Sequence, residues 1–478
     1  MAEYLTPDLC IIGAGSGGLS VAAAARAFGA SVVIVEKGEM GGDCLNFGCV
    51  PSKALIAAGR HAHAMRSGEP FGITGQDPQI SFRRVQEHIQ DVIAGIAPHD
   101  SVSRFEGLGA TVIKAEGKFV DPRTLSAGDQ LIRARRFVIA TGSVPSVPQI
   151  PGLDQVPYFT NETIFSNTRK LTHLAIIGGG PIGIELAQAY RRLGSAVTVI
   201  EATTPLQRSD PELAEIALRR VAEDGVDIRS NTRVVEIQPR SQGIGVLIES
   251  GEAREVLDVS HILVAVGRTP NLEPLDLAKA KVRRDRKPPH RLRIGKNLKT
   301  SNRRIYVLGD AAGGQQFTHF ANYQAGLVIR NALFGLPVSE KPELIPHATY
   351  CDPEIAEIGV TEPVARRRHK EGYRVVRWSF AENDRARTER ETYGLAKMIV
   401  DRRGRIVGAG IVGAGAGELI ALFSFAIANR LKASHLLNFV APYPTLSEIA
   451  KRLGTEYFRE QTHNPWLRRI IALNRFLP

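Results

Sequence analysis

The chain has 478 residues, of which 43% are hydrophobic and 6% aromatic, so it is long enough for several domains with ordinary α/β cores. The net charge is +12, and only four cysteines are present, too few for a disulfide-rich secreted scaffold. A strand is expected from residue 8, which leaves no room for a signal peptide, and the apolar run at 420–427 is too short to span a membrane. We therefore expect a cytoplasmic α/β protein without a transmembrane segment.

The first element in chain order is a glycine-rich nucleotide-binding motif. Residues 8–12 predict a strand, an alanine-rich helix follows, and a second strand ends at Glu36. The turn between strand and helix carries Gly13, Gly15 and Gly18. In such motifs the glycines make the turn, admit a pyrophosphate and let helix pack on strand, while the acid accepts hydrogen bonds from ribose hydroxyls. Strand, turn, helix and acid in register predict a Rossmann domain that binds a dinucleotide.

Two cysteines, Cys44 and Cys49, follow this motif. A thiol pair beside a nucleotide site predicts a dithiol/disulfide couple that exchanges electrons with the cofactor. A structural zinc site usually needs four ligands, and Cys10 and Cys351 lie far away in the sequence. The alternatives are two unreactive thiols or a structural disulfide.

The expected helix after the cysteine pair favours a reactive thiolate. Pro51 suits the first turn of a helix, and a helix N-terminus together with the charge of Lys53 lowers a cysteine pKa. Residues five apart on a regular helix point about 140° apart. A Cys44–Cys49 disulfide therefore requires an irregular loop entering the helix, which Asn46 and Gly48 suit.

The nucleotide-binding motif then recurs with Gly178, Gly180, Gly183 and Glu201, and the spacing from first glycine to acid is the same in both copies. Two such motifs predict two dinucleotides bound at once, a flavin passing electrons between a nicotinamide and sulfur. Glu201 favours NAD over NADP, because it would repel a 2′-phosphate. Arg208, seven residues later, argues weakly for NADP instead.

Together these segments resemble the class I FAD-dependent pyridine nucleotide-disulfide oxidoreductases, the group of glutathione reductase, dihydrolipoamide dehydrogenase and mercuric reductase. The resemblance covers nearly the whole chain and includes further motifs at 140–142, 267–271, 305–310 and 443–448. It implies an α/β fold with two Rossmann-like domains, for FAD and NAD, and an α+β C-terminal dimerisation domain. The implied boundaries are 1–150 for the first FAD segment, 151–270 for the NAD(P) domain, 271–345 for the return to the FAD domain, and 346–478 for the interface domain with an amphipathic tail.

The resemblance also implies roles for single residues. Cys49 would face the flavin and Cys44 would be the interchange thiol that meets the substrate. Lys53 would lie near the flavin and pair with Glu185, and the chain would form a homodimer. The implied FAD-binding residues are Gly13, Gly15, Gly18, Glu36, Gly42, Lys53, Thr141, Gly142, Asp310 and Thr318. The implied NAD-binding residues are Gly178, Gly180, Gly183, Glu201 and Gly267.

One position departs from the family pattern. Family disulfide reductases carry a histidine before the Pro-Thr of the C-terminal motif, oriented by a later glutamate, and it moves protons at the interchange thiol of the other subunit. Here Tyr443 occupies that position while Glu448 remains. Tyrosine has a reference pKa of about 10, against about 6.5 for histidine, so it is a poor base near neutral pH. Either Tyr443 acts as a weak acid, or it fills the space, or the substrate needs less proton transfer.

Three functions follow from these observations. The leading hypothesis is an NAD(P)H:disulfide oxidoreductase that resembles dihydrolipoamide dehydrogenase and acts on a small disulfide or dithiol. The alternative is a mercuric-reductase-like enzyme that reduces a metal ion or a quinone, although no cysteine after Cys351 could deliver mercury. The third is a flavoprotein that senses redox state.

Two basic segments complete the chain. Lys279–Arg304 holds twelve Lys and Arg against one acid, Asp285. A solvated surface is the favoured interpretation, docking of an anionic partner is the alternative, and no nucleic-acid recognition motif accompanies the charge. Residues 464–478 predict an amphipathic helix, which we expect to pack on the partner subunit; the alternative is weak docking on an anionic membrane surface.

Overall fold

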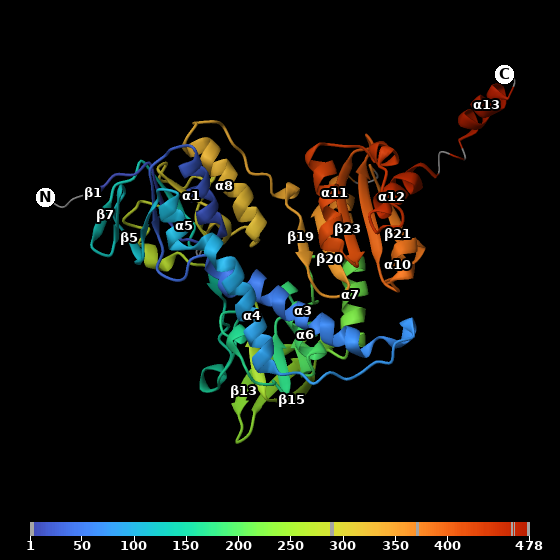
Figure 1. Cartoon of the computed structure of the whole chain (residues 1–478), viewed down its shortest axis with the longest axis horizontal. Coiled ribbons are helices and arrows are strands. Elements are labelled where there is room, and N and C mark those ends of the chain that lie inside the picture. The colour runs from blue at the N-terminus through green and yellow to red at the C-terminus, as the bar shows by residue number, and fades with distance from the viewer. Residues whose placement is uncertain (1–3, 287–290, 370–371, 460–461, 463, 476–478) are drawn as a thin grey trace. The chain divides into compact units, whose positions relative to one another are not determined.

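The computed structural model describes residues 4–286, 291–369, 372–459, 462 and 464–475 (Figure 1). These residues form two compact units. Unit 1 comprises 1–178, 189–202 and 231–342, and unit 2 comprises 179–188, 203–230 and 343–478. The fold is mixed α/β, as predicted; the four domain boundaries stay predictions.

Unit 1 is built around a five-stranded parallel sheet. Its order is β18-β8-β2-β3-β4, with β18 at Ile305–Val307, β8 at Arg136–Ile139, β2 at Leu9–Ile12, β3 at Val32–Val35 and β4 at Thr111–Ile113. On one face pack α1 (Ser16–Ala27) and α8 (Thr318–Ala332), which contact each other. β2 is buried throughout, as in other parallel sheets covered on both faces. The strand, turn, helix and strand expected for the first nucleotide-binding motif are confirmed.

The other face of this parallel sheet shares a core with a second sheet. That sheet has the order β1-β7-β6-β5, with β1 at Tyr4–Leu5, β7 at Gln130–Ile132, β6 at Thr124–Ala127 and β5 at Gly117–Asp121. A two-stranded ribbon pairs β9 (Ser143–Pro145) with β17 (Arg268–Pro270) in antiparallel register. The remaining helices of this region are α2 (Gly42–Asn46), α3 (Cys49–Arg66), α4 (Phe82–Ile96) and α5 (Val102–Gly107).

The second nucleotide-binding motif also adopts the predicted elements. β10 (His173–Ile177) is the central strand between β11 (Ala196–Ile200) and β16 (His261–Val264), and all pairs are parallel. The helix between β10 and β11 is α6 (Pro181–Arg192). An antiparallel sheet follows, with β13 at Arg233–Pro239, β14 at Ile244–Ser250 and β15 at Ala253–Val259.

Unit 2 centres on a five-stranded antiparallel sheet of order β19-β20-β23-β22-β21. The strands are β19 at His347–Thr349, β20 at Glu354–Gly359, β21 at Tyr373–Ser379, β22 at Leu395–Asp401 and β23 at Ile406–Gly413. The helices are α7 at Pro211–Glu223, α9 at Glu362–His369, α10 at Asp384–Thr388, α11 at Ala416–Ala428, α12 at Glu448–Arg459 and α13 at Pro465–Asn474; a short strand, β12, lies at Asp227–Arg229.

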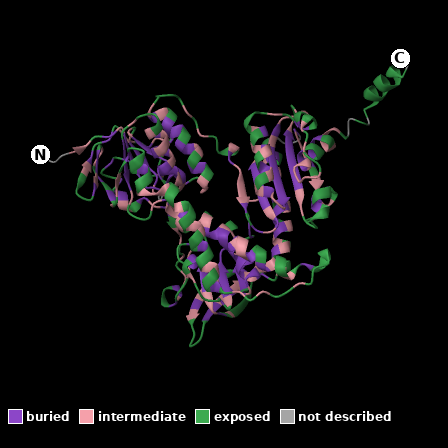
Figure 2. Cartoon of the chain, viewed as in Figure 1, coloured by how far each residue is buried: buried purple, intermediate pink, exposed green. Residues whose placement is uncertain are grey.

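The helices of unit 2 cover the sheet unequally. α11 and α12 share the main core with the strands, whereas α7 packs against β20 and β23. The apolar run at 420–427 lies in helix α11, and only one face of this helix is buried: Phe423 lies in the core and Phe425 is 67% exposed. Figure 2 shows the strands of both units largely purple and α13 green, because α13 buries no residue. Among the described residues no helix is both long and apolar enough to cross a membrane.

A row of polar residues crosses the sheet of unit 2. Strand register places His347 beside Glu357, Glu357 beside Gly410, Gly410 beside Lys397, and Lys397 beside Arg377. Side chains alternate between the faces of a strand, so the neighbours of Lys397 enter the core while Lys397 itself faces the opposite side. A side chain at Gly410 would meet α7 there, since its Cβ would lie 2.5 Å from Leu213 Cδ1.

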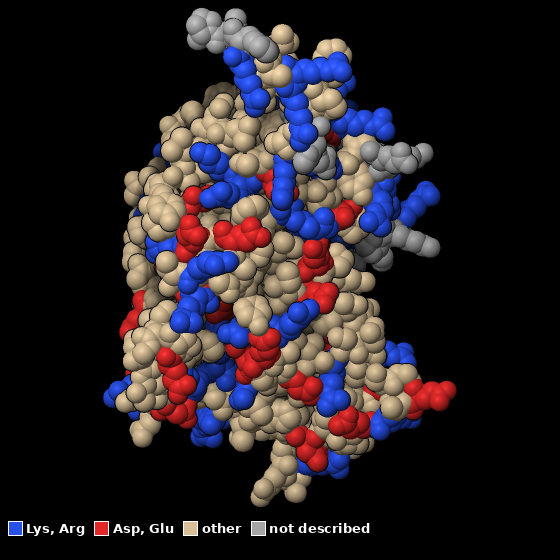
Figure 3. Space-filling view, turned by 90° about the vertical axis from the view of Figure 1, so that its right-hand side faces the viewer, with Lys and Arg blue, Asp and Glu red and all other residues tan. Residues whose placement is uncertain are grey.

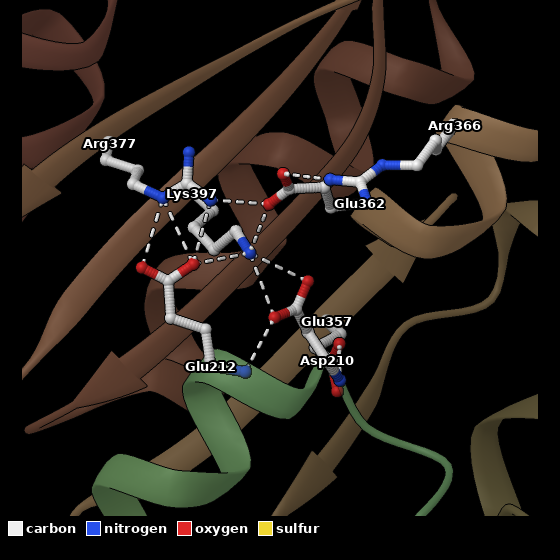
Figure 4. Close-up of polar contacts among 7 residues, drawn as sticks. All are labelled: Asp210, Glu212, Glu357, Glu362, Arg366, Arg377 and Lys397. Atoms are coloured by element: carbon white, nitrogen blue, oxygen red, sulfur yellow. Dashed lines mark hydrogen bonds and ion pairs between the residues drawn. The ribbon is translucent and has the colours of Figure 1, made fainter. Parts of the chain in front are cut away.

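Lys397 is the buried centre of an ion cluster whose outer members, Glu212 and Arg377, are partly exposed (Figure 4). Its Nζ lies 2.9 Å from Asp210, 2.8 Å from Glu212 and 2.8 Å from Glu362. Arg377 bridges Glu212 and Glu362 at 2.9 and 2.5 Å. Burial raises the pKa of both glutamates, but the hydrogen bonds and charges of the two cations outweigh it and hold each pKa below its usual value. The cluster therefore stabilises the fold above the unfolded pKa of about 4.3 and loses this effect as the pH falls through the folded values.

We predict that Lys397→Met strongly destabilises the protein at neutral pH. The side chains of Lys397 and Asp210 are 3% and 5% exposed, so the substitution leaves a buried carboxylate without its cation. Breaking such a pair costs about 3 to 5 kcal/mol. Urea unfolding measures this loss, which should shrink at acid pH, where the carboxylates are protonated.

The matched control is Arg219→Met on the same helix α7. Arg219 pairs with Glu215, and the two side chains are 62% and 73% exposed. An exposed pair contributes less than about 1 kcal/mol. Equal losses in the two variants would contradict a stabilising role for the buried cluster.

Candidate functional site: a thiol pair at the start of α3

The cysteine segment forms two helices joined by an irregular turn. α2 ends at Asn46, Gly48 has φ −126° and ψ −111°, and α3 begins at Cys49. The predicted irregular loop is therefore present, and Pro51 lies in the first turn of α3. A side chain at Gly48 would not fit, because its Cβ would lie 3.0 Å from the Asp43 carbonyl oxygen and 3.3 Å from the Cys44 Cα.

This turn brings the two thiols into hydrogen-bonding contact. Both cysteines are free thiols; Cys44 is half-buried, and Cys49 is exposed as a residue although its sulfur is largely shielded from water. A hydrogen bond from Cys44 lowers the pKa of Cys49 to about 6, assisted by the Thr318 hydroxyl and the charge of Lys53 and opposed by burial and the charge of Asp43. The same hydrogen bond raises the pKa of Cys44, and burial and the negative Cys49 add to the shift. The pair thus holds one thiolate and one thiol near neutral pH.

Thr318 and Lys53 lie beside this thiolate. The Thr318 Oγ1 is 3.6 Å from the Cys49 Sγ, and Thr318 is the first residue of α8. Lys53, in the second turn of α3, donates from Nζ to the Ser52 Oγ at 3.3 Å. Both residues were predicted from the sequence, and the structure brings both to the cysteine pair.

A buried arginine holds the cysteine loop in place, and this was not predicted. Arg268 Nη2 lies 2.9 Å from Asp43 Oδ1, and the side chain of Arg268 is 9% exposed. The arginine also donates to the Ser143 Oγ at 2.8 Å and to the Asn161 Oδ1 at 2.8 Å. Asn161 donates in turn to Asp43 Oδ1 and to the Phe47 carbonyl, each at 3.2 Å. The only sequence signal was the position of Arg268 in the Gly-Arg-Thr-Pro-Asn motif.

The first glycine motif lies against the cysteine loop. A Cβ on Gly42 would approach Gly15 Cα to 2.8 Å, and one on Gly18 would approach the Gly13 carbonyl oxygen to 2.0 Å. No side chain caps the first turn of α1, so its amide groups are available to an anion such as a pyrophosphate. Glu36 accepts hydrogen bonds from the Ala14 and Gly38 amides, each at 2.6 Å. These features fit the dinucleotide end of FAD.

The predicted residues at the other end of the flavin site surround Asp310. Ser143 Oγ donates to Asp310 Oδ2 at 2.6 Å. Burial raises the pKa of Asp310, and the Ser143 hydrogen bond and the charge of Arg268 oppose it. Thr141 Oγ1 donates to the Asn271 carbonyl at 2.6 Å, and Gly142 has φ +67°. Ser143 thus links the predicted flavin site to the arginine that holds the cysteine loop.

The predicted nicotinamide residues lie in the elements expected for them. Gly178 follows β10 with φ +113°, and its Cβ would meet the Ala265 carbonyl oxygen at 2.5 Å. Gly180 precedes α6, Gly183 lies in its first turn, and Glu201 follows β11. Gly267 has φ +124°, and a Cβ there would meet nothing within 4 Å.

Three predicted catalytic residues belong to unit 2. Tyr443 is 72% exposed and its hydroxyl donates to Asp384 Oδ2 at 3.2 Å. The charge of Asp384, this hydrogen bond and the charge of Glu448 raise the pKa of Tyr443. Glu448 starts α12, and Glu185 is 5% exposed and accepts from the Tyr350 amide at 2.9 Å. Because Lys53 belongs to unit 1, its ion pair with Glu185 stays a prediction.

Three further features of the chain bear on its chemistry: the two remaining cysteines, the possible metal ligands and the basic segment. Cys10 and Cys351 are buried, which raises the pKa of both thiols. Within the described part of the chain, no three His, Cys, Asp or Glu residues are grouped to hold a metal ion. In the basic segment, Val282, Leu292 and Leu298 enter the core while Arg283 and Arg293 are exposed; residues 287–290 lie outside the described residues.

Comparison with known proteins identifies the class. The model of the pyridine nucleotide-disulphide oxidoreductase family matches residues 7–349, and the model of its dimerisation domain matches residues 345–453. The chain belongs to this family, whose members bind FAD and use NAD(P)H. It is an FAD-dependent pyridine nucleotide-disulfide oxidoreductase with the dimerisation domain of the family.

Similar proteins fall into several functional groups. A mercuric reductase from Bacillus cereus is 33% identical over 449 residues, which cover 93% of this chain and 70% of that protein. A dihydrolipoyl dehydrogenase from Thermus scotoductus is 34% identical over 484 residues, covering 96% and 99%. Among solved structures, the Cu(II) complex of the HOCl-induced flavoprotein disulfide reductase RclA from Escherichia coli has a TM-score of 0.82 at 26% identity, covering 93% of this chain and 98% of that one.

We predict that Cys49 in the reduced protein reacts with iodoacetamide with a midpoint near pH 6. Thiolate is the reactive form, so the rate follows the ionisation of Cys49. Cys44→Ala removes a hydrogen bond to a charged group and should raise the midpoint by about one pH unit. Mass spectrometry of the Cys49 peptide measures the rate.

Cys351→Ala serves as the control, because this buried thiol should leave the midpoint of Cys49 unchanged. A midpoint near the ordinary thiol pKa, about 8.5, or one that does not respond to Cys44→Ala, would contradict the account of the pair.

Proposed function

We propose that the protein is an NADH-dependent disulfide reductase of the dihydrolipoamide dehydrogenase type, with Cys44 as the interchange thiol and Cys49 as the thiol facing the flavin. The observation that carries the proposal is the placement of Cys49 at the first residue of α3, beside the Cys44 thiol and 3.6 Å from the Thr318 hydroxyl, all of which favour a thiolate there. When bound, FAD supplies the route by which an electron pair from a nicotinamide reaches this cysteine pair. Glu36, Asp310 and Thr318 would hold it, together with the first glycine motif.

The thiol pair has the groups needed to reduce a disulfide. As the Cys44 sulfur attacks one sulfur of the substrate, its proton passes along its hydrogen bond to the Cys49 thiolate. This forms a mixed disulfide and releases the first substrate thiolate, which takes from Cys49 the proton that came from Cys44. The Cys49 thiolate then attacks Cys44, forming the Cys44–Cys49 disulfide and releasing the second substrate thiolate, which is protonated from solvent.

This proton path supports a reductase that has tyrosine in place of the family histidine. The pKa of Tyr443 is raised, so its hydroxyl stays protonated near neutral pH and can form hydrogen bonds but is a poor base. Cys49 serves as the internal base instead. In the proposed homodimer, Tyr443 and Glu448 of one chain approach Cys44 of the other, and the exposed apolar residues Phe425 and Val440 of unit 2 support such an interface.

The proposed electron donor is NADH rather than NADPH. Glu201 follows β11, at the position where an acid bonds the ribose 2′-hydroxyl of NAD. A carboxylate there repels the 2′-phosphate of NADPH.

A second candidate function is reduction of a metal ion or a quinone. Relatives named mercuric reductase and the Cu(II) complex of a similar reductase favour it, as does the raised pKa of Tyr443, since such acceptors need less proton transfer. Here the Cys44 and Cys49 sulfurs would bind the metal ion as a substrate, because thiolates prefer soft metals.

The third candidate function is a redox sensor, whose flavin would be reduced by NADH without turnover of any electron acceptor.

Steady-state NADH oxidation with lipoamide as acceptor tests the proposal. We expect turnover in the native protein and a loss of at least about a thousandfold in Cys44→Ser, because the hydroxyl cannot replace the nucleophilic thiol. A quinone acceptor in parallel is the control, and its reduction should survive the substitution. Quinone turnover without lipoamide turnover in the native protein would favour the second candidate, and no turnover with any acceptor would favour the sensor.

A further inference from the structure

The C-terminal helix α13 is the one amphipathic helix of unit 2 that buries no residue within the described part of the chain. It is a well-defined helix at its start: Asn464 accepts from the Trp466 amide at 2.9 Å, and Pro465 occupies the first turn. It also lies outside both matched family models, the second of which ends at residue 453. The family fold therefore does not account for it.

The two faces of α13 differ sharply. At roughly 100° per residue, its large apolar side chains fall within an arc of about 160°, which apart from them holds only Asn474. They are exposed to 40–70%, namely Trp466, Leu467, Ile470, Ile471 and Leu473. The remaining arc carries Arg468, Arg469 and Arg475, and residues 464–475 contain no Asp or Glu. The Arg469 guanidinium lies 5.4 Å from the Trp466 ring centre.

The end of unit 2 from which α13 emerges is also basic. The β22–β23 turn, the residues after α11 and α12 lie together: Ala433 N donates to the Gly404 carbonyl at 2.9 Å, and Tyr457 Oη would lie 3.6 Å from a Cβ on Gly404. The exposed basic residues of these elements are Arg402, Arg403, Arg430, Lys432, Lys451, Arg452 and Arg459. The upper part of Figure 3 shows Lys and Arg gathered on this side of the chain with few Asp or Glu among them.

We propose that α13 and this basic end of unit 2 dock on an anionic phospholipid bilayer. Basic amphipathic helices with Trp and Leu on the apolar face lie in the plane of a membrane interface, with that face in the acyl boundary. Each Lys or Arg near an anionic surface adds about 1 kcal/mol of attraction. Five residues lie between Arg459 and Pro465, so the start of α13 stays within about 20 Å of the end of α12, and both helices can reach one surface.

Charge distinguishes a bilayer from a second copy of this chain as the occupant. Every copy carries a net charge of +12, so a like surface repels the three arginines, whereas anionic lipid attracts them. In the proposed homodimer two α13 helices would be presented, and binding at two points raises the overall affinity of a single short helix.

Cosedimentation of the holoenzyme with vesicles tests the proposal. We expect binding to vesicles of equal parts phosphatidylglycerol and phosphatidylcholine, little binding to pure phosphatidylcholine, and release by salt. Ile470→Glu should lower the binding constant about tenfold or more, because it places a charge in the apolar face. Arg468→Gln with Arg469→Gln should weaken binding and reduce its salt dependence.

The matched control is Ile73→Glu, which adds the same charge at an isoleucine of similar exposure, 64% against 53% for Ile470. It should bind vesicles like the native protein, and all variants should oxidise NADH at the native rate. Failure of the native protein to bind anionic vesicles, or equal binding by Ile470→Glu, would overturn the proposal. So would conversion of a dimer to a monomer by removal of residues 464–478, since α13 would then be a contact between copies.

Discussion

The proposed chemistry of this protein depends on one constraint, the position of Cys49 at the first residue of α3. The helix N-terminus, the Cys44 thiol, the Thr318 hydroxyl and Lys53 all favour a negative charge on this sulfur. The irregular turn at Gly48 puts Cys44 within reach, which a continuous helix could not do. In the proposed mechanism this dithiol supplies both the nucleophile and the base, so disulfide exchange is compatible with the tyrosine at position 443.

The rest of unit 1 keeps this turn in place. Arg268, from the ribbon strand β17, binds Asp43 in the cysteine loop, and Asn161 fastens the loop at Phe47. Ser143, which accepts from Arg268, donates to Asp310 of the predicted flavin site. The same hydrogen-bonded chain therefore connects the cysteine loop and the flavin site, so the geometry between thiol and cofactor does not depend on the loop alone.

Much of this arrangement could be predicted from the sequence, because its signals are local. Short contiguous segments, such as Gly13 to Glu36 and Cys44 to Pro51, determine the glycine motifs with their strands and helices and the cysteine turn. The networks around Arg268 and Lys397 could not be predicted. Asp43 and Arg268 are 225 positions apart, and Asp210 and Lys397 are 187 apart, so their pairing is set by sheet register and domain packing. Hydrophobic periodicity in the sequence gives no information about ion pairs between residues so far apart.

The measurement that tests the account most directly is the mapping of thiols after anaerobic reduction. The oxidised holoenzyme is treated with one equivalent of NADH, alkylated, and analysed by mass spectrometry. The account predicts that Cys44 and Cys49 both become available for alkylation, while the buried Cys10 and Cys351 stay unlabelled. If NADH reduces the flavin but releases no new thiols at these two positions, the Cys44–Cys49 pair is not the redox centre and the central claim is wrong.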